Sequence, residues 1–225
     1  MEPAAEPVSI RISDDRSVSG LWLAPAGADT CFVFAHGAGA GMHHAFMATF
    51  AEGLAERGVA SLRYQFPYME AGSKRPDAPK VAHAAVRSAT AQALRRFPQA
   101  RLIAGGKSFG ARMTSQAQAL EPLPGVRGLA FLGYPLHPAG KPAVDRADHL
   151  KRIGIPMLFL QGNRDELADL ELLQPLIQEL GSGATLAVID DADHSFHVRL
   201  RSGRTDAQVM SAVLDTFVEW ASRLP

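Results

Sequence analysis

Six short apolar runs, each bounded by glycine or proline, alternate with segments of helical periodicity over most of the chain. The runs occupy residues 30–37, 58–66, 100–108, 126–135, 155–163 and 184–191, and the helical segments occupy 45–57, 78–97, 109–120, 167–180 and 205–223. Strands that are apolar along their whole length must be buried on both faces, and parallel neighbours need crossover helices. The pattern predicts an α/β fold, with a mostly parallel central sheet and helices on both faces.

A different pattern precedes these runs. VSIRIS (8–13) and SVSGLWLAP (17–25) alternate apolar and polar residues with period two, and the turn DDR lies between them. This alternation predicts an opening antiparallel hairpin. The chain has 225 residues, 47% of them apolar, and contains no low-complexity linker, so it can bury one large core. We therefore expect a single domain over residues 1–225.

Charge and hydropathy narrow the classes of partner. The 23 basic and 23 acidic residues give a formal net charge of zero without a long run of either sign, so we expect no binding to nucleic acid. No stretch approaches 18 uninterrupted apolar residues, and MEPAAEPVSI lacks the basic start and apolar run of a secretory signal. Cys31, the only cysteine, excludes an internal disulfide. These features predict a cytoplasmic protein that does not bind membranes.

The residues that end each strand are the most informative, because functional groups of parallel α/β sheets gather beyond the carboxyl ends of the strands. Ser108 ends one of the runs, within GKSFG (106–110), which fits G-x-S-x-G. In that motif the serine occupies a strained strand-to-helix turn, and the glycines let strand and helix approach where a Cβ would clash. The hydroxyl then lies at a helix N-terminus, where the dipole and free N–H groups favour negative charge.

A serine hydroxyl becomes a nucleophile when a base removes its proton, and a carboxylate that orients the base makes it more effective. Asp165 follows the run that ends at residue 163, and His194 follows the last run. Ser108, Asp165 and His194 are therefore the candidate nucleophile, acid and base. The neighbouring alternatives are Asp190, Asp191 and Asp193 for the acid and His197 for the base.

The glycine-rich segment HGAGAGMHH (36–44) follows an early strand. Such a loop supplies one N–H donor to the oxyanion of a tetrahedral intermediate, and the residue after the nucleophile supplies the other. We assign these donors to Ala38 and Phe109. A dinucleotide fold also uses a glycine-rich loop, but it needs an acidic residue at the end of the next strand, which here closes with RYQF.

The remaining histidines raise the question of a metal site. The chain contains neither H-E-x-x-H nor C-x-x-C spacing, so we expect no metal and no cofactor. We expect His36 to fix the glycine-rich loop by hydrogen bonding. His36 and His137 are also candidates to line the substrate pocket.

Four segments in the same order resemble the α/β-hydrolase superfamily: VFAHGAG (33–39), GGKSFGAR (105–112), QGNRD (161–165) and DADHSFH (191–197). FLGYPLHPAGKP (131–142), followed by HLKRIGIPMLFLQGNRD (149–165), is similar to small predicted hydrolases related to testis-expressed protein 30 and, more distantly, to dienelactone hydrolases. The resemblance implies a triad in the order Ser108, Asp165, His194. Dienelactone hydrolases use a cysteine nucleophile, where this chain has serine.

Together these features predict a serine hydrolase that cleaves a small carboxylic ester or related acyl compound through an acyl-enzyme. Only the loop 136–154 separates two strands at the point where many lipases insert a helical cap, so we expect no large cap and an open cleft. The alternative from another class is a non-catalytic interaction module that keeps the hydrolase fold, because a fold does not fix a function.

Overall fold

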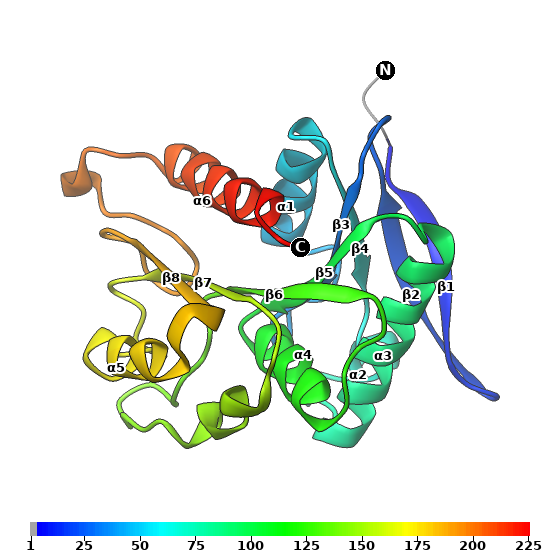
Figure 1. Cartoon of the computed structure of the whole chain (residues 1–225), viewed down its shortest axis with the longest axis horizontal. Coiled ribbons are helices and arrows are strands. Elements are labelled where there is room, and N and C mark those ends of the chain that lie inside the picture. The colour runs from blue at the N-terminus through cyan, green and yellow to red at the C-terminus, as the bar shows by residue number, and fades with distance from the viewer. Residues whose placement is uncertain (1–3) are drawn as a thin grey trace.

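The computed structural model describes residues 4–225, whose strands form a sheet in the order β1-β2-β4-β3-β5-β6-β7-β8 (Figure 1). The hairpin strand β1 pairs antiparallel with β2, β2 pairs antiparallel with β4, and every later pairing is parallel. The predicted hairpin and mostly parallel sheet are confirmed. The strands are β1 (Glu6–Ser13), β2 (Arg16–Leu23), β3 (Thr30–Ala35), β4 (Val59–Tyr64), β5 (Arg101–Lys107), β6 (Val126–Leu132), β7 (Met157–Gly162) and β8 (Ala184–Ile189).

Helices cover both faces of this sheet, as predicted. In Figure 1, α1 and α6 lie together over one face, while α3, α4 and α5 lie over the other. None of the helices between residues 4 and 225 is long and apolar enough to cross a membrane. The helices are α1 (Ala45–Glu56), α2 (Pro67–Glu70), α3 (Pro79–Arg96), α4 (Phe109–Leu120), α5 (Leu170–Leu180) and α6 (Asp206–Ser222).

Side chains of β3 alternate between two cores because successive residues of a strand point to opposite faces. Phe32 and Phe34 pack against α1 and α6, where Phe50 and Phe217 complete a cluster of fully buried rings. Phe32 lies 4.9 Å from Phe34 and 4.9 Å from Phe217 between ring centroids. Each ring contributes roughly 1.5–3 kcal/mol of transfer free energy on burial. Cys31 faces the other core and is fully buried, which raises the pKa of its thiol to about 12.

Two local features differ from the predicted pattern. Helix α5 begins at Leu170 rather than at Leu167, because the Asp169 carboxylate accepts a hydrogen bond from the Glu171 N–H and caps the helix there. The Pro-rich and charged segment between the predicted strand 58–66 and the predicted helix 78–97 opens with an additional helix, α2, whose first residue is Pro67. Proline suits that position because the N–H it lacks has no partner in a first turn.

The loop between β6 and β7 contains one short 3₁₀ helix, Asp145–Arg152. No lid-sized helical insertion stands between these two strands. The carboxyl end of the parallel sheet is therefore left open to solvent at this point.

Candidate active site

Ser108 occupies the turn between β5 and α4 with φ 52° and ψ −112°, a backbone conformation that costs a non-glycine residue about 1–3 kcal/mol. The flanking glycines make this turn possible. A Cβ at Gly106 would lie 2.4 Å from the Ala35 oxygen, and one at Gly110 would lie 2.5 Å from the same atom. The Ser108 side chain makes no capping hydrogen bond to α4. The sequence motif thus corresponds to a strained turn with an uncommitted hydroxyl.

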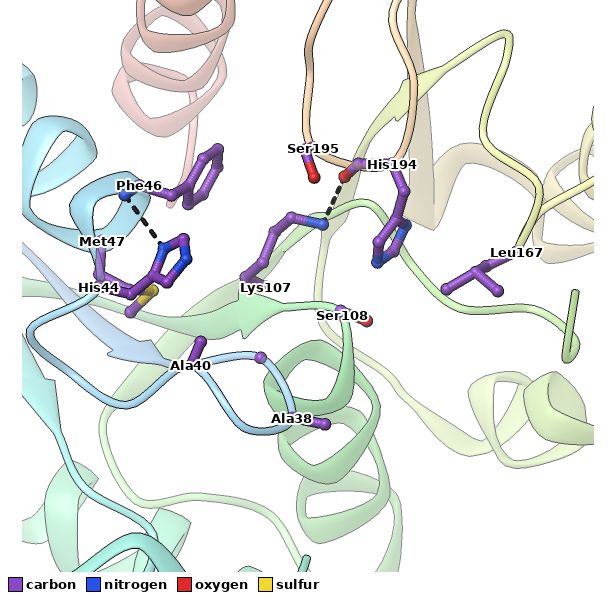
Figure 2. Close-up of a pocket in the computed structure, with 11 residues that line it drawn as sticks. Ala38, Ala40, His44, Phe46, Met47, Lys107, Ser108, Leu167, His194 and Ser195 are labelled. Carbon is purple, nitrogen blue, oxygen red and sulfur yellow. Dashed lines mark hydrogen bonds between the residues drawn. The ribbon is translucent and has the colours of Figure 1, made fainter. Parts of the chain in front are cut away.

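A cavity of about 380 Å³ lies beside this hydroxyl (Figure 2). Its walls come from five segments far apart in the sequence: the loop after β3, the start of α1, the end of β5, the loop after β7 and the loop after β8. In Figure 2 these segments are represented by Ala38, Phe46, Lys107, Leu167 and His194. The cavity is mostly apolar, and Ser108 is one of the polar residues that line it.

His194 and Asp165 are hydrogen-bonded to each other, with 2.6 Å between Nδ1 and Oδ2. The Asp165 side chain is fully buried and accepts two further hydrogen bonds, from Gln161 Nε2 at 2.5 Å and from the Leu167 N–H at 2.8 Å. A buried carboxylate requires such partners, because loss of its hydration is otherwise costly. With Nδ1 committed to Asp165, the Nε2 atom of His194 is left free for chemistry in the cavity.

Two of the three alternative acids, Asp190 and Asp193, and the alternative base His197 have other hydrogen-bond partners. Asp190 accepts a hydrogen bond from the Asn163 side chain, and Asp193 accepts from the N–H groups of Ser195 and His197. The His197 ring is bonded to Asp206. None of these hydrogen bonds involves the His194 imidazole, whose Nδ1 is bonded to Asp165.

Ser108 Oγ and His194 line the same cavity without a hydrogen bond between them in this structure. Catalytic hydrogen bonds are often long before substrate binds and shorten in the complex. The structure thus brings Asp165 and His194 into direct contact, and Ser108 lines the same cavity beside the His194 ring (Figure 2).

The backbone N–H groups of Ala38 and Phe109 have no hydrogen-bond acceptor among residues 4–225. Ala38 lines the cavity, and Phe109 begins α4 directly after Ser108. Two unpaired N–H groups beside a serine at a helix N-terminus are suited to receive a developing oxyanion.

Polar side chains from the segment after β4 and from α2 hold the glycine-rich loop in place. The Gly39 N–H donates to Tyr68 Oη at 2.9 Å, and the Met42 N–H donates to Gln65 Oε1 at 2.7 Å. Burial raises the pKa of Tyr68, so its hydroxyl stays neutral. Tyr68 lies between the predicted strand 58–66 and the predicted helix 78–97, where no sequence spacing indicates this role.

His36 and His137 do not line the cavity beside Ser108. His36 is fully buried; its Nε2 accepts from the Phe66 N–H, so Nδ1 carries the proton and donates to the Gly37 oxygen at 2.7 Å. Desolvation lowers the pKa of His36 to about 4, which keeps the ring neutral. These bonds fix the start of the glycine-rich loop.

His137 also has a structural role, in the loop after β6. The ring atom Nε2 of His137 accepts a hydrogen bond from the Asp169 N–H at 2.9 Å. The main-chain N–H of His137 donates to the Leu167 main-chain oxygen at 3.0 Å. It thereby ties the loop after β6 to the segment that follows Asp165. In the part of the chain that the structure describes, no group of three or more His, Cys, Asp or Glu side chains could hold a metal ion.

Comparison with known proteins agrees with this architecture. The alpha/beta hydrolase domain family matches residues 28–222. A dienelactone hydrolase from Anabaena variabilis superposes with a TM-score of 0.78 at 20% identity, covering 100% of this chain and 99% of its own. A serine hydrolase without a lid from Xanthomonas campestris gives 0.73 at 21%, covering 100% and 96%.

The esterase domain of a Rhodothermus marinus protein gives a TM-score of 0.75 at 17% identity, covering 98% of this chain and 99% of that domain. At such identities the likeness shows the fold alone. The predicted α/β-hydrolase fold without a large cap is confirmed.

Proposed function

The chain belongs to the alpha/beta hydrolase domain family, and from this membership together with the site geometry we propose that it is a serine hydrolase acting on a small carboxylic ester or related acyl compound. One observation carries the proposal. A single cavity is lined by the strained Ser108, by Ala38 with its unpaired N–H, and by His194, whose ring is bonded to the buried Asp165. The second unpaired N–H belongs to Phe109, the residue directly after Ser108. That set of groups meets the requirements of acyl transfer to a serine.

In the proposed reaction, Ser108 Oγ attacks the carbonyl carbon while His194 Nε2 takes the hydroxyl proton. The carbonyl oxygen becomes an oxyanion and accepts hydrogen bonds from the Ala38 and Phe109 N–H groups, each worth about 3–4 kcal/mol in the transition state. When the tetrahedral intermediate collapses, His194 returns the proton to the departing alcohol and Ser108 is left acylated. Water then attacks the acyl-enzyme with His194 as base, which releases the acid and restores the serine.

Asp165 has two roles in this scheme. By accepting a hydrogen bond at Nδ1, it holds the imidazole in the tautomer whose Nε2 can accept the serine proton. Its negative charge also stabilises the imidazolium that forms during each step. Gln161 and the Leu167 N–H also bind this carboxylate, so its oxygens keep hydrogen-bond partners although the side chain is fully buried.

The experiment that tests the proposal is labelling of the pure protein with a fluorophosphonate probe, which reacts with an activated serine. We expect stoichiometric labelling, and peptide mapping should place the adduct on Ser108. Ser195 lines the same cavity and supplies an internal control, since it should remain unmodified. A folded protein that neither reacts with the probe nor hydrolyses any member of a broad ester and thioester panel would instead support an interaction module that keeps the fold.

The size of the cavity predicts a preference for short acyl groups. A long acyl chain gains about 0.8 kcal/mol for each buried methylene only where a pocket encloses it. This cavity of about 380 Å³ lies under no lid, and the β6–β7 loop holds only a short 3₁₀ helix. In a p-nitrophenyl ester series from acetate to palmitate, we expect kcat/KM to be greatest for short chains, without a rise at the micellar transition. A kcat/KM that keeps climbing beyond octanoate would contradict this prediction.

A further inference from the structure

Lys107 is the last residue of β5 and directly precedes Ser108, yet its side chain is buried, with only 9% of the residue exposed. Its Nζ donates a hydrogen bond to the main-chain oxygen of His194 at 2.6 Å, the dashed contact beside His194 in Figure 2. Nζ also lies 5.8 Å from the ring centroids of both Phe46 and Phe196. A buried ammonium in such surroundings retains its charge through the carbonyl dipole and the faces of the two rings.

The loop that carries His194 has a strained backbone. Asp191 and Phe196, on either side of His194, have φ of 58° and 61°, and Ser108 is the third non-glycine residue with positive φ in residues 4–225. Such conformations persist only where surrounding contacts hold them. The Phe196 ring is held by stacking on Phe46, with centroids 5.9 Å apart and an interplanar angle of 14°. The His194 loop therefore depends on tertiary contacts for its position.

The hydrogen bond from Lys107 joins the strand end that bears the nucleophile to the residue that bears the base. No hydrogen bond links Ser108 Oγ to His194 directly, and Asp165 restrains only the imidazole ring. Nζ and the ring both lie close to Gly133: a Cβ there would be 2.9 Å from Nζ and 3.2 Å from His194 Nδ1. The main chain of His194 is thus fixed from the Ser108 side by Lys107.

We propose that Lys107 is a positioning residue, whose ammonium holds the His194 main chain at the distance from Ser108 that proton transfer requires. This inference rests on the proposed hydrolase function. It assigns no contact with substrate to Lys107. Its effect is exerted through His194, and misplacement of a reacting group by about 1 Å can cost about 100-fold in rate.

The electrostatic surroundings make this contact sensitive to pH. Desolvation lowers the pKa of Lys107 to about 8, partly opposed by the carboxylates of Asp165 and Asp193. Besides Lys107, the titratable side chains that line the cavity are those of His194 and His44. As pH rises through about 8 the amine becomes neutral, so the hydrogen bond loses its charge assistance and the cation–π contacts disappear. The contact is therefore present below this pH and weakens above it.

The test compares Lys107→Met, Lys107→Arg and, as a matched control, Lys80→Met, which removes an exposed lysine from α3. We expect Lys107→Met to lower kcat about 10- to 100-fold while KM changes less than about threefold, because the base and not the substrate is displaced. Wild-type kcat should fall above about pH 8. Lys107→Arg should move this fall to higher pH, since a guanidinium stays charged, and Lys80→Met should behave as wild type.

A measurement without turnover separates this inference from the proposed function. In wild-type protein, NMR signals of the Lys107 side chain and of the backbone amides of residues 191–197 should titrate together, and Lys107→Arg should remove this joint transition. Joint titration in a protein without hydrolase activity would overturn the proposed function and keep the contact. Amide signals of 191–197 that ignore the Lys107 titration, or a Lys107→Met variant with wild-type kcat and alkaline profile, would overturn the positioning role.

Discussion

Replacing Ser108 with alanine is expected to lower kcat by about six orders of magnitude, because it removes the oxygen atom that attacks the substrate. The fold should survive the change. Ser108 Oγ makes no capping hydrogen bond to α4, and the strained backbone is held by the Gly106 and Gly110 approach rather than by the hydroxyl. Steady-state hydrolysis of a short ester, together with thermal unfolding of the same preparation, measures both expectations.

Ser182→Ala is the matched control for this experiment. Ser182 is exposed and precedes β8, so it lies at the amino end of the parallel strands, opposite the cavity. It should leave both kcat and the unfolding temperature unchanged. If Ser108→Ala retained more than a few per cent of wild-type turnover, the assignment of the nucleophile would be wrong.

The strands and helices could be predicted well because the buried, parallel architecture leaves a strong signal in the sequence. Each strand from β3 to β7 is buried along nearly all of its length, so its sequence is a nearly continuous apolar run. Helix α4 spans the predicted residues, Phe109–Leu120, because the G-x-S-x-G turn fixes its first residue. The strand order, by contrast, depends on how the crossovers pack, which no local pattern encodes.

The start of α5, which differs from the predicted start, is decided by one side-chain hydrogen bond. The Asp169 cap sets the start of α5, and it competes with a hydrophobic periodicity that begins at Leu167. Residues Leu167 and Ala168 serve the site instead, since the Leu167 N–H binds Asp165. A capping residue is visible in a sequence, but which of two nearby aspartates caps and which binds a histidine is settled only by the path of the loop.

In the candidate site, the proximity of the residues could be predicted, and the orientation of their side chains could not. The topology of a parallel sheet places Ser108, Asp165 and His194 at one end of it, so their proximity could be predicted from strand ends alone. The orientation of rings and amines could not. His36 is fully buried and accepts a hydrogen bond from the Phe66 N–H, so it does not line the cavity. The ammonium of Lys107 donates a hydrogen bond to the main-chain oxygen of His194.

The second large effect is expected at the base. His194→Ala should lower kcat about as much as the serine change, because in serine hydrolases the two groups act as one unit and either loss costs about six orders of magnitude. His197→Ala, three residues away, should change kcat less than about twofold, since the two rings differ in their surroundings. The His197 ring is exposed, and its hydrogen bond to Asp206 raises its pKa, so more of it is protonated and unable to act as a base.

This pair of variants isolates the imidazole from the loop that carries it. His194→Ala retains the main-chain oxygen that binds Lys107 Nζ, and it leaves Phe196 stacked on Phe46, so the loop keeps its main anchors. A loss of activity in that variant therefore reports the missing ring and not a displaced backbone. The measurement is kcat for each variant on one short ester at the wild-type pH optimum. If His197→Ala did the greater harm, the base would have to be reassigned, and the Lys107 contact would then hold a residue with no part in proton transfer.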